Sequence, residues 1–528
     1  MQKLGIIILG LCLSGVTYSQ EKMIVFFKDK NAANQLQEFS KRTKERRVRN
    51  NVRPDAKDLV VNSDYLAALS QDGELLGVSR WLNAVSYSSS LSDEELVTKH
   101  PFILKTIRIG KARTEQNRGE QMSEEKALDY GMAATQIEQL SLDCLHDLGY
   151  TGNGIYLAVI DAGFNNMDNI DYFDSVHLEG RILDNYDFVN NTSFVYALSG
   201  HGTAVSSCIV AEKDSPDKYI GAAKDVNLAL YVTEDITSET EIEEFNLVLA
   251  LERCDSAGVD LANISLGYFN FDDTTTSHVY ADLDGQTTIA SIGVNTAFSK
   301  GIIVLTSAGN SGPSNISTPC DASDGFCVGA IDEFGDYASF SSVGPNAVGQ
   351  VKPDVVAMGK DAWVIMASGD LSSGSGTSFS SPIMAGATAC LIEANPTKTA
   401  GQIMDAIRES AHQFSTPDNF LGYGIPDFCS ANDLLNNSAG INGTTIYGPN
   451  VYPVPASDYI IVSGLEEINK QVKITLFSTS GAVVLSELYK VNKGETVFSI
   501  SGVAAGMYTM QVTENGGKSH YKRVLISD

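Results

Sequence analysis

Basic residues are scarce in this sequence: 37 Lys and Arg face 65 Asp and Glu, which gives a formal net charge of −28 at pH 7. Such an acidic chain repels phosphate backbones, so nucleic acid is not expected as a partner. Long apolar runs are also scarce, because beyond the first twenty residues no stretch is apolar and long enough to span a bilayer. With 528 residues, of which 43% are hydrophobic, the chain is long enough for roughly two to four globular domains.

The first twenty residues, MQKLGIIILGLCLSGVTYSQ, combine one lysine, an apolar run and small residues at Thr17 and Ser19. This order predicts a secretory signal peptide over residues 1–19. An uncleaved anchor is the alternative, but the apolar run is too short to cross a bilayer. We therefore expect a mature protein outside the cytoplasm, with no membrane span after signal removal.

Cysteine is infrequent and odd in number once Cys12 leaves with the signal peptide, since seven of the eight remain. At least one thiol must then be unpaired or bridge to another chain. Cys320 and Cys327 flank the short loop PCDASDGFC, where either a disulfide or two buried thiols would fit an exported protein. Cys208 and Cys390 lie in small, apolar helical runs, which favours buried free thiols.

The middle of the chain alternates short apolar runs with helical stretches. IYLAVIDAG, VNLALYV, VDLANISLG, GIIVLTSAGN and FCVGAID are too uniformly apolar to alternate, as expected for strands covered on both faces. Together with the intervening helices they predict an α/β fold, a parallel sheet flanked by helices. Ligands of such sheets bind beyond the carboxyl ends of the strands, where Asp161, Ser265 and Asn310 stand.

The flanking zones differ from this pattern. The first opens with the strand-like MIVFFKDK and carries seven Lys or Arg between Lys41 and Arg53, which predicts either an acidic intramolecular partner or a solvated helix face. The last zone reads as short strands separated by turns, a small β-sandwich. The predicted boundaries are 1–19 for the signal peptide, 20–115 for a small α+β segment, 116–126 for a linker, 127–432 for the α/β domain, 433–446 for a second linker and 447–528 for the sandwich.

Three polar residues of the middle zone suit nucleophilic catalysis. A serine that cleaves a peptide bond needs a base within hydrogen-bond reach and a carboxylate that orients the base. Of seven histidines, His201 differs from the rest, because it stands between glycines in SGHGTAVSSCIVA and opens a helix of small residues. Asp161 closes a strand, and Ser378 opens the helix of GTSFSSPIMAGATACLIEANP. Taken singly, Ser378 could be only a helix N-cap and His201 only structural.

The order Asp, His, Ser is one of the known chain orders of such a triad. GTSFS lacks the second glycine of GxSxG, and no HExxH occurs, so an α/β-hydrolase and the commonest zinc-protease signature are excluded. The boxes VIDAGF, HGTAV, SAGNSGP and GTSFSSP resemble those of the subtilisin-like serine proteases, the subtilase family, in the family's order. Ala162 and Ala204 depart from the family's usual residues, but neither position supplies a triad atom.

The resemblance implies a role for each matching residue. Ser378 would be the nucleophile, His201 the general base, and Asp161 the orienter of the imidazole. The backbone N–H of Ser378 and the side chain of Asn310 would form the oxyanion hole. No cofactor would be required for catalysis. The implied substrate-binding residues are Ser265, Leu266, Gly267, Ala308, Gly309 and Asn310.

The same resemblance gives the flanking zones a meaning. The zone 20–115 is similar to the inhibitory propeptide of the family, and the zone 447–528 to the C-terminal sorting domain of type IX secretion. The expected partners are therefore protein or peptide substrates, the chain's own propeptide and the secretion machinery of a Gram-negative bacterium. The protein would be secreted, extracellular or attached to the cell surface. From composition alone, the last zone could also be a carbohydrate- or partner-binding sandwich.

Two further alternatives stay open at this point. Asp272, Asp273, Asp282 and Asp284 lie in one loop-rich region, where they could bind a structural calcium ion or be solvated acids. The whole protein could also be a catalytically inactive secreted binding or adhesive protein on a subtilase scaffold.

Overall fold

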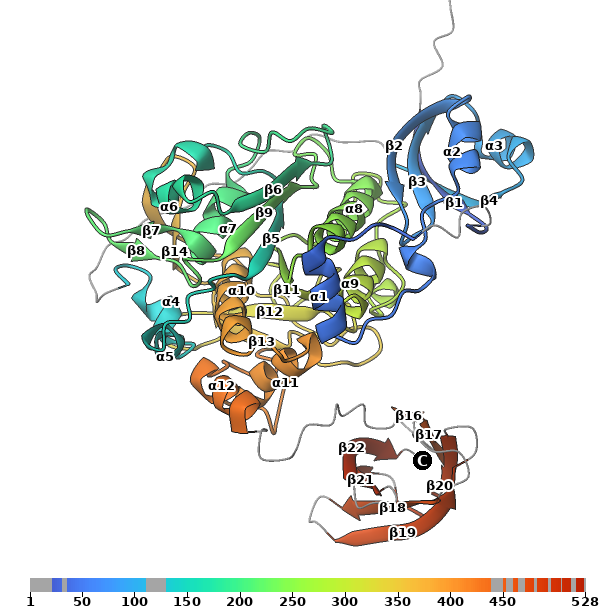
Figure 1. Cartoon of the computed structure of the whole chain (residues 1–528), viewed down its shortest axis with the longest axis vertical. Coiled ribbons are helices and arrows are strands. Elements are labelled where there is room, and N and C mark those ends of the chain that lie inside the picture. Colours follow the sequence, from blue (N-terminus) through green and yellow to red (C-terminus); the bar gives the residue numbers. More distant parts are fainter. Residues whose placement is uncertain are drawn as a thin grey trace, which may run out of the picture. The chain divides into compact units, whose positions relative to one another are not determined.

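The computed structural model describes residues 21–30, 36–110 and 130–437, and then 450–452, 459–463, 471–478, 482–491, 495–504, 506–513 and 519–526. The chain divides into two compact units, Met1–Ser438 and Ala439–Asp528 (Figure 1). The predicted signal peptide, the linker 116–126 and most of the linker 433–446 lie outside the described residues. Among the helices that are described, none combines the length and the apolar character needed to cross a membrane.

The N-terminal part of the first unit is a four-stranded antiparallel sheet of order β2-β3-β1-β4. In β1 the residues alternate between two faces: Met23 and Val25 pack into a small core of their own, whereas Ile24 packs against Phe245 of helix α8. This period of two explains how one short strand both builds the segment and attaches it to its neighbour. The elements are β1 (Glu21–Phe27), α1 (Lys41–Arg49), η1 (Ala56–Asp58), α2 (Ser63–Leu69), β2 (Gly73–Ser79), β3 (Ala84–Ser89), α3 (Asp93–Lys99) and β4 (Ile103–Arg108).

The rest of the first unit is built on a seven-stranded sheet of order β13-β12-β11-β10-β5-β9-β6, in which every neighbouring pair is parallel. Along β5, Leu157 and Val159 enter one core, and Ala158 and Ile160 enter the core on the opposite face. The sheet is thus covered on both sides, which confirms the predicted fold class. The strands are β5 (Tyr156–Asp161), β6 (Ile182–Asp187), β9 (Asn227–Val232), β10 (Leu261–Ile264), β11 (Ile303–Ser307), β12 (Phe326–Ile331) and β13 (Val355–Met358).

Helices cover both faces of this sheet. Helices α8 and α9 pack on one face through residues such as Leu247 and Val294, and α7 and α10 pack on the other through Val205 and Ile383. The helices are α4 (Ala134–Glu138), α5 (Asp143–Asp147), α6 (Asp174–Leu178), α7 (His201–Val210), α8 (Glu241–Ala257), α9 (Ile289–Ser299), α10 (Thr377–Ala394), α11 (Ala400–Ser410) and α12 (Phe428–Asn437). The short elements are η2 (Met167–Asn169), η3 (Asp171–Phe173), η4 (Tyr280–Asp282), β7 (Glu212–Lys213), β8 (Tyr219–Ile220), β14 (Ala362–Ile365) and β15 (Leu371–Gly374).

Helix α10 is the most deeply buried of the long helices, and its small residues are what permit that. A Cβ on Gly386 would come 2.6 Å from the Cβ of Ala222, so a larger side chain at this position has no room. Pro382 is the sixth residue of the helix and lies beyond its first turn, and the Ser378 carbonyl that it leaves without a helical N–H accepts the Ser265 hydroxyl at 2.9 Å. The helix begins at Thr377, one residue before Ser378, and Asn395 is its C-cap.

Four of the cysteines are paired. Cys320 and Cys327 form one disulfide, and Cys144 is bonded to Cys429, which joins α5 to α12 across 285 residues. The remaining thiols in the described residues are those of Cys208, Cys254 and Cys390, all of them buried. The predicted free thiols at Cys208 and Cys390 are confirmed.

The second unit is a pair of antiparallel sheets, β16-β17-β20 and β19-β18-β21-β22. Alternate residues of facing strands, such as Ile460, Ile474 and Phe498, form its core. This is the predicted sandwich, with β16 as a strand that the sequence pattern did not predict. The strands are β16 (Asn450–Tyr452), β17 (Tyr459–Ser463), β18 (Gln471–Ser478), β19 (Val483–Lys490), β20 (Glu495–Ser499), β21 (Gly506–Thr513) and β22 (Ser519–Ile526).

Candidate active site

The structure brings Asp161 and His201 into direct contact. Asp161 is the last residue of β5 and His201 the first residue of α7. The Nδ1 atom of His201 lies 2.9 Å and 3.0 Å from the two carboxylate oxygens of Asp161. The carboxylate is fully buried and also accepts the backbone N–H of Ala162 at 2.7 Å. A proton held on Nδ1 by this carboxylate leaves Nε2 as the basic nitrogen of the ring.

Glycine allows this close approach of strand and helix. A Cβ on Gly202 would meet the carbonyl oxygen of Gly163 at 2.5 Å and the Cβ of Asp161 at 3.0 Å. The backbone N–H of Gly202 instead donates to that carbonyl at 3.0 Å. The glycine that follows the histidine in HGTAV is therefore required by the contact between β5 and α7.

Ser378 lies in the first turn of α10, and its hydroxyl is not the helix cap. The N-cap is Gly376, which offers no side chain, so the alternative of a purely capping serine is wrong. The ring of His201 lies 6.3 Å, centroid to centroid, from that of Phe379, the residue after Ser378. The imidazole is thus held beside the start of α10.

Asn310 is oriented by the same helix turn. Its Oδ1 accepts the backbone N–H of Thr377 at 2.9 Å and the Thr377 hydroxyl at 3.0 Å, so the amide nitrogen faces the other way. A Cβ placed on Gly376 would lie 3.6 Å from Asn310 Nδ2, 3.7 Å from Ser378 N and 3.9 Å from Ser378 Oγ. These three polar atoms therefore all lie within 4 Å of one point beside Gly376.

A cavity of about 370 Å³ adjoins Ser378. Of the predicted substrate-binding residues, Ser265, Leu266, Gly267, Gly309 and Asn310 line it. Ala308 does not, because its side chain is buried in a separate apolar cluster with Leu283 and Ile316. Glu239, which the sequence analysis did not single out, lines the cavity as well.

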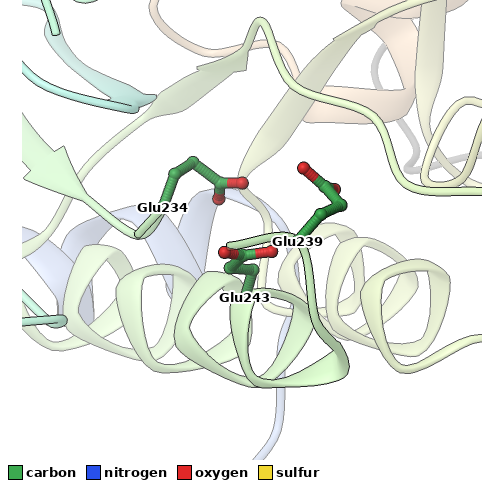
Figure 2. Close-up of side chains that lie close together, drawn as sticks. All are labelled: Glu234, Glu239 and Glu243. Atoms are coloured by element: carbon green, nitrogen blue, oxygen red, sulfur yellow. The ribbon is translucent and has the colours of Figure 1, made fainter. Parts of the chain in front are cut away.

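The four aspartates predicted as a possible calcium site do not gather into one. Asp273 and Asp284 each accept backbone N–H groups of their own turns, as does Asp282, and Asp272 accepts the N–H of Glu239. In the described residues, the group of carboxylates close enough to share a metal ion is instead Glu234, Glu239 and Glu243 (Figure 2). The four aspartates therefore do not form a group of three carboxylates within reach of one ion, and calcium binding in their region stays a prediction.

The basic helix α1 is docked on the acidic end of α8. Arg46 and Arg47 contact the two oxygens of Asp255 at 2.5 Å and 2.7 Å, and Arg80 contacts Asp255 at 2.8 Å. Arg46 and Asp255 are buried. The structure thus supports the predicted intramolecular partner, and it contradicts the alternative of a fully solvated helix face.

Comparison with known proteins agrees with this arrangement. The model of the subtilase family matches residues 152–424, more than half of the chain, and the chain belongs to that family. The peptidase S8 propeptide domain of Bacteroidota matches residues 22–126, and a secretion system C-terminal sorting domain matches residues 450–527. These matches confirm the predicted class, a subtilisin-like serine peptidase with a propeptide, and a secreted location outside the cell or on its surface.

Individual relatives cover the peptidase part. The chain is 29% identical over 282 residues to the thermophilic serine proteinase of Bacillus sp. (strain AK1), covering 53% of this chain and 62% of that protein. It is 28% identical over 289 residues to subtilisin BL of Lederbergia lenta, covering 55% and 94%. Among solved structures, the prenylagaramide maturation protease PagA aligns with a TM-score of 0.45 at 22% identity, covering 56% of this chain and 98% of that one.

Proposed function

We propose that this protein is a secreted serine endopeptidase, made as a zymogen, that hydrolyses peptide bonds through Asp161, His201 and Ser378. The observation that carries the proposal is the pairing of His201 Nδ1 with the buried Asp161 carboxylate beside the first turn of α10. With Nδ1 occupied, Nε2 accepts the proton of the Ser378 hydroxyl as its oxygen bonds to the scissile carbonyl carbon. Asp161 stabilises the imidazolium that results.

The remaining steps follow from the same groups. The negative charge that develops on the carbonyl oxygen lies between Asn310 Nδ2 and the backbone N–H of Ser378. When the tetrahedral intermediate collapses, the C–N bond breaks and His201 returns its proton to the leaving amine. Water, deprotonated by His201, then hydrolyses the acyl ester of Ser378 and restores the free hydroxyl.

Substrate binding is assigned to the cavity wall formed by Ser265, Leu266 and Gly267. An extended peptide laid along this segment would add a strand by backbone hydrogen bonds. A Cβ on Gly267 would lie 2.2 Å from the hydroxyl oxygen of Ser317, so no larger residue fits at this position of the cavity wall. The residue before the scissile bond would enter the cavity beside Asn310.

The propeptide and the sorting domain would control inhibition and export of the precursor. In the precursor, residues 20–115 would remain docked on α8 and α9 and inhibit the enzyme until they are cut. The sandwich at 447–528 would direct export by a type IX-like route. Catalysis itself requires no cofactor in this mechanism, since each proton and charge is handled by a side chain or a backbone amide.

The proposal is tested by incubating casein with the protein freed of its propeptide, beside Ser378→Ala. Cleavage by the parent and none by the variant is expected. Ser380→Ala is the matched control, because this neighbouring serine is buried in the same helix and bonds to the carbonyl of Thr377. Equal and negligible cleavage by the parent and Ser378→Ala would favour the inactive binding protein instead.

A further inference from the structure

Three glutamates meet on one side of the sheet, next to the candidate active site. Glu234 follows β9, Glu239 lies in the loop that leads to α8, and Glu243 is in the first turn of α8 (Figure 2). One carboxylate oxygen from each lies within 4.8 Å of the others. Glu234 and Glu243 are buried, and Glu239 is half-buried at the cavity wall.

Two other buried glutamates of the same helix have cationic partners, whereas Glu241 is paired with no described Lys, Arg or His and its Oε2 accepts the backbone N–H of Gly110 at 3.2 Å. Glu244 pairs with His278 at 2.8 Å, and Glu252 pairs with Arg80 at 3.0 Å. Within the described part of the chain, no Lys, Arg or His forms such a pair with Glu234, Glu239 or Glu243. Among the described residues, the cluster therefore lacks the cationic partner that Glu244 and Glu252 have.

The carboxylate of Glu243 shows this lack most directly. Its Oε2 accepts the backbone N–H of Thr240 at 2.9 Å, but its Oε1 is buried and makes no hydrogen bond to any described residue. The carboxylate of Glu234, by contrast, accepts hydroxyl groups of Tyr268 and Thr233 at 2.8 Å. A buried oxygen without a partner is costly, and this one belongs to a carboxylate with two other carboxylates close by.

The burial and the crowding of like charges affect the pKa of all three carboxyl groups. Burial first, and then repulsion from the neighbouring acids, raises the pKa of the Glu234, Glu239 and Glu243 carboxyls above their usual range. Backbone N–H groups near Glu243 act in the opposite direction without cancelling this effect. Only a cation, or protons, can hold such a group together at neutral pH.

We propose that Glu234, Glu239 and Glu243 bind one calcium ion. Oxygens bound to the same Ca²⁺ at about 2.3–2.6 Å can be at most about 5 Å apart, a limit that the three carboxylates meet. Carboxylate is the hard oxygen ligand that Ca²⁺ prefers, and water from the cavity can complete the coordination. The ion supplies the partner that Glu243 Oε1 lacks.

The position of the site gives the ion a structural effect on the enzyme. It ties the end of β9 to the first turn of α8 and fixes Glu239, which shares the cavity with Ser378 and Asn310. Calcium binding does not depend on hydrolysis, so it is measurable in a protein that cannot cleave. An experiment that shows no calcium binding therefore says nothing against the proposed peptidase activity, and the absence of cleavage says nothing against the calcium site.

The test uses the full chain carrying Ser378→Ala, stripped with chelator and titrated with calcium chloride in a calorimeter. One binding event is expected, weakened at least tenfold by Glu243→Gln and by Glu239→Gln. Asp284→Asn is the matched control, since it removes an acid of the sequence-predicted calcium region and should leave the affinity unchanged. Far-UV circular dichroism of each variant verifies that it is folded.

Three results would overturn the proposal. They are no heat of calcium binding, an unchanged calcium affinity in folded Glu239→Gln, or a calcium affinity that falls in Asp284→Asn instead. The rival occupant is a basic side chain of the substrate. It would be favoured if calcium did not bind while cleavage of Lys- or Arg-containing peptides fell in Glu239→Gln, and that outcome also overturns the metal site.

Discussion

The docking of the propeptide depends on a charge network that one substitution breaks. In Asp255→Asn the shape of the side chain is kept and its charge is lost. Arg80 would still pair with Glu252 at 3.0 Å and Arg47 with Asp58 at 2.7 Å. Arg46 would keep only carbonyl partners such as Val259 O at 2.6 Å, so of these three arginines it is the one that loses its counter-ion.

The expected magnitude follows from that single uncompensated charge. Removing one partner of a buried ion pair costs about 3–5 kcal/mol, because the other charge stays desolvated. Since about 1.4 kcal/mol corresponds to a factor of ten, undocking should become at least about a hundredfold more favourable. The mature peptidase carries no propeptide arginines, so its own stability should change little.

Hydrogen exchange of the full-length Ser378→Ala precursor measures this opening. Amides of β1 and α1 should exchange at least about a hundredfold faster in Asp255→Asn. Lys41→Gln is the control, because Lys41 is exposed and its pair with Glu45 at 3.6 Å is worth about 0.5 kcal/mol at most. Exchange in Asp255→Asn at the rate of the parent would refute the reasoning.

Three other variants test separate parts of the catalytic mechanism and the fold. Asn310→Ala should lower kcat by about 10²–10³ with little change in KM, a magnitude known from a subtilisin, and an unchanged kcat would remove Asn310 from the oxyanion hole. Asp161→Asn should lower kcat by about 10⁴, because the amide no longer holds the imidazole tautomer, and activity near that of the parent would count against the triad. Replacing Cys144 and Cys429 together by serine should cost about 2–5 kcal/mol of stability, seen as a lower Tm in calorimetry; an equal Tm would show that this bridge contributes nothing.

The central strands were predictable because both of their faces are buried. Runs such as IYLAVID carry no polar residue before the last position, and β5 is covered on both sides. β6 and β13, the strands at the two edges of the sheet, were both missed: ILDNYD is mostly polar, and the apolar run VVAM is only four residues long. An edge strand needs fewer apolar residues than a central one, so its sequence resembles a loop.

The placement of side chains was less predictable than the placement of strand ends. Ala308 follows β11 directly, as the predicted wall requires, but its side chain turns into the core, which spacing alone does not indicate. Asp272 and Asp284 are close in sequence, yet Asp272 accepts the N–H of Glu239 from another segment, whereas Asp284 accepts the N–H of Gln286 in its own turn. Glu234 and Glu243 are brought together only by the fold of the loop between β9 and α8.

Only one of the two disulfides could be predicted from the sequence. The short loop between Cys320 and Cys327 suggested a bond, and the bond is present. Cys144 and Cys429 are 285 residues apart, and only the packing of α5 against α12 makes them neighbours. An odd number of cysteines predicts a free thiol without saying which one it is.

The most direct test of the central claim is covalent labelling of the propeptide-free protein with a fluorophosphonate, followed by peptide mapping. The reagent captures only a serine whose hydroxyl is activated by a base and whose oxyanion is stabilised. We expect one adduct, on Ser378, that persists in Ser380→Ala and is lost in His201→Ala. An adduct on another residue, or none on Ser378 in a folded protein, would contradict it.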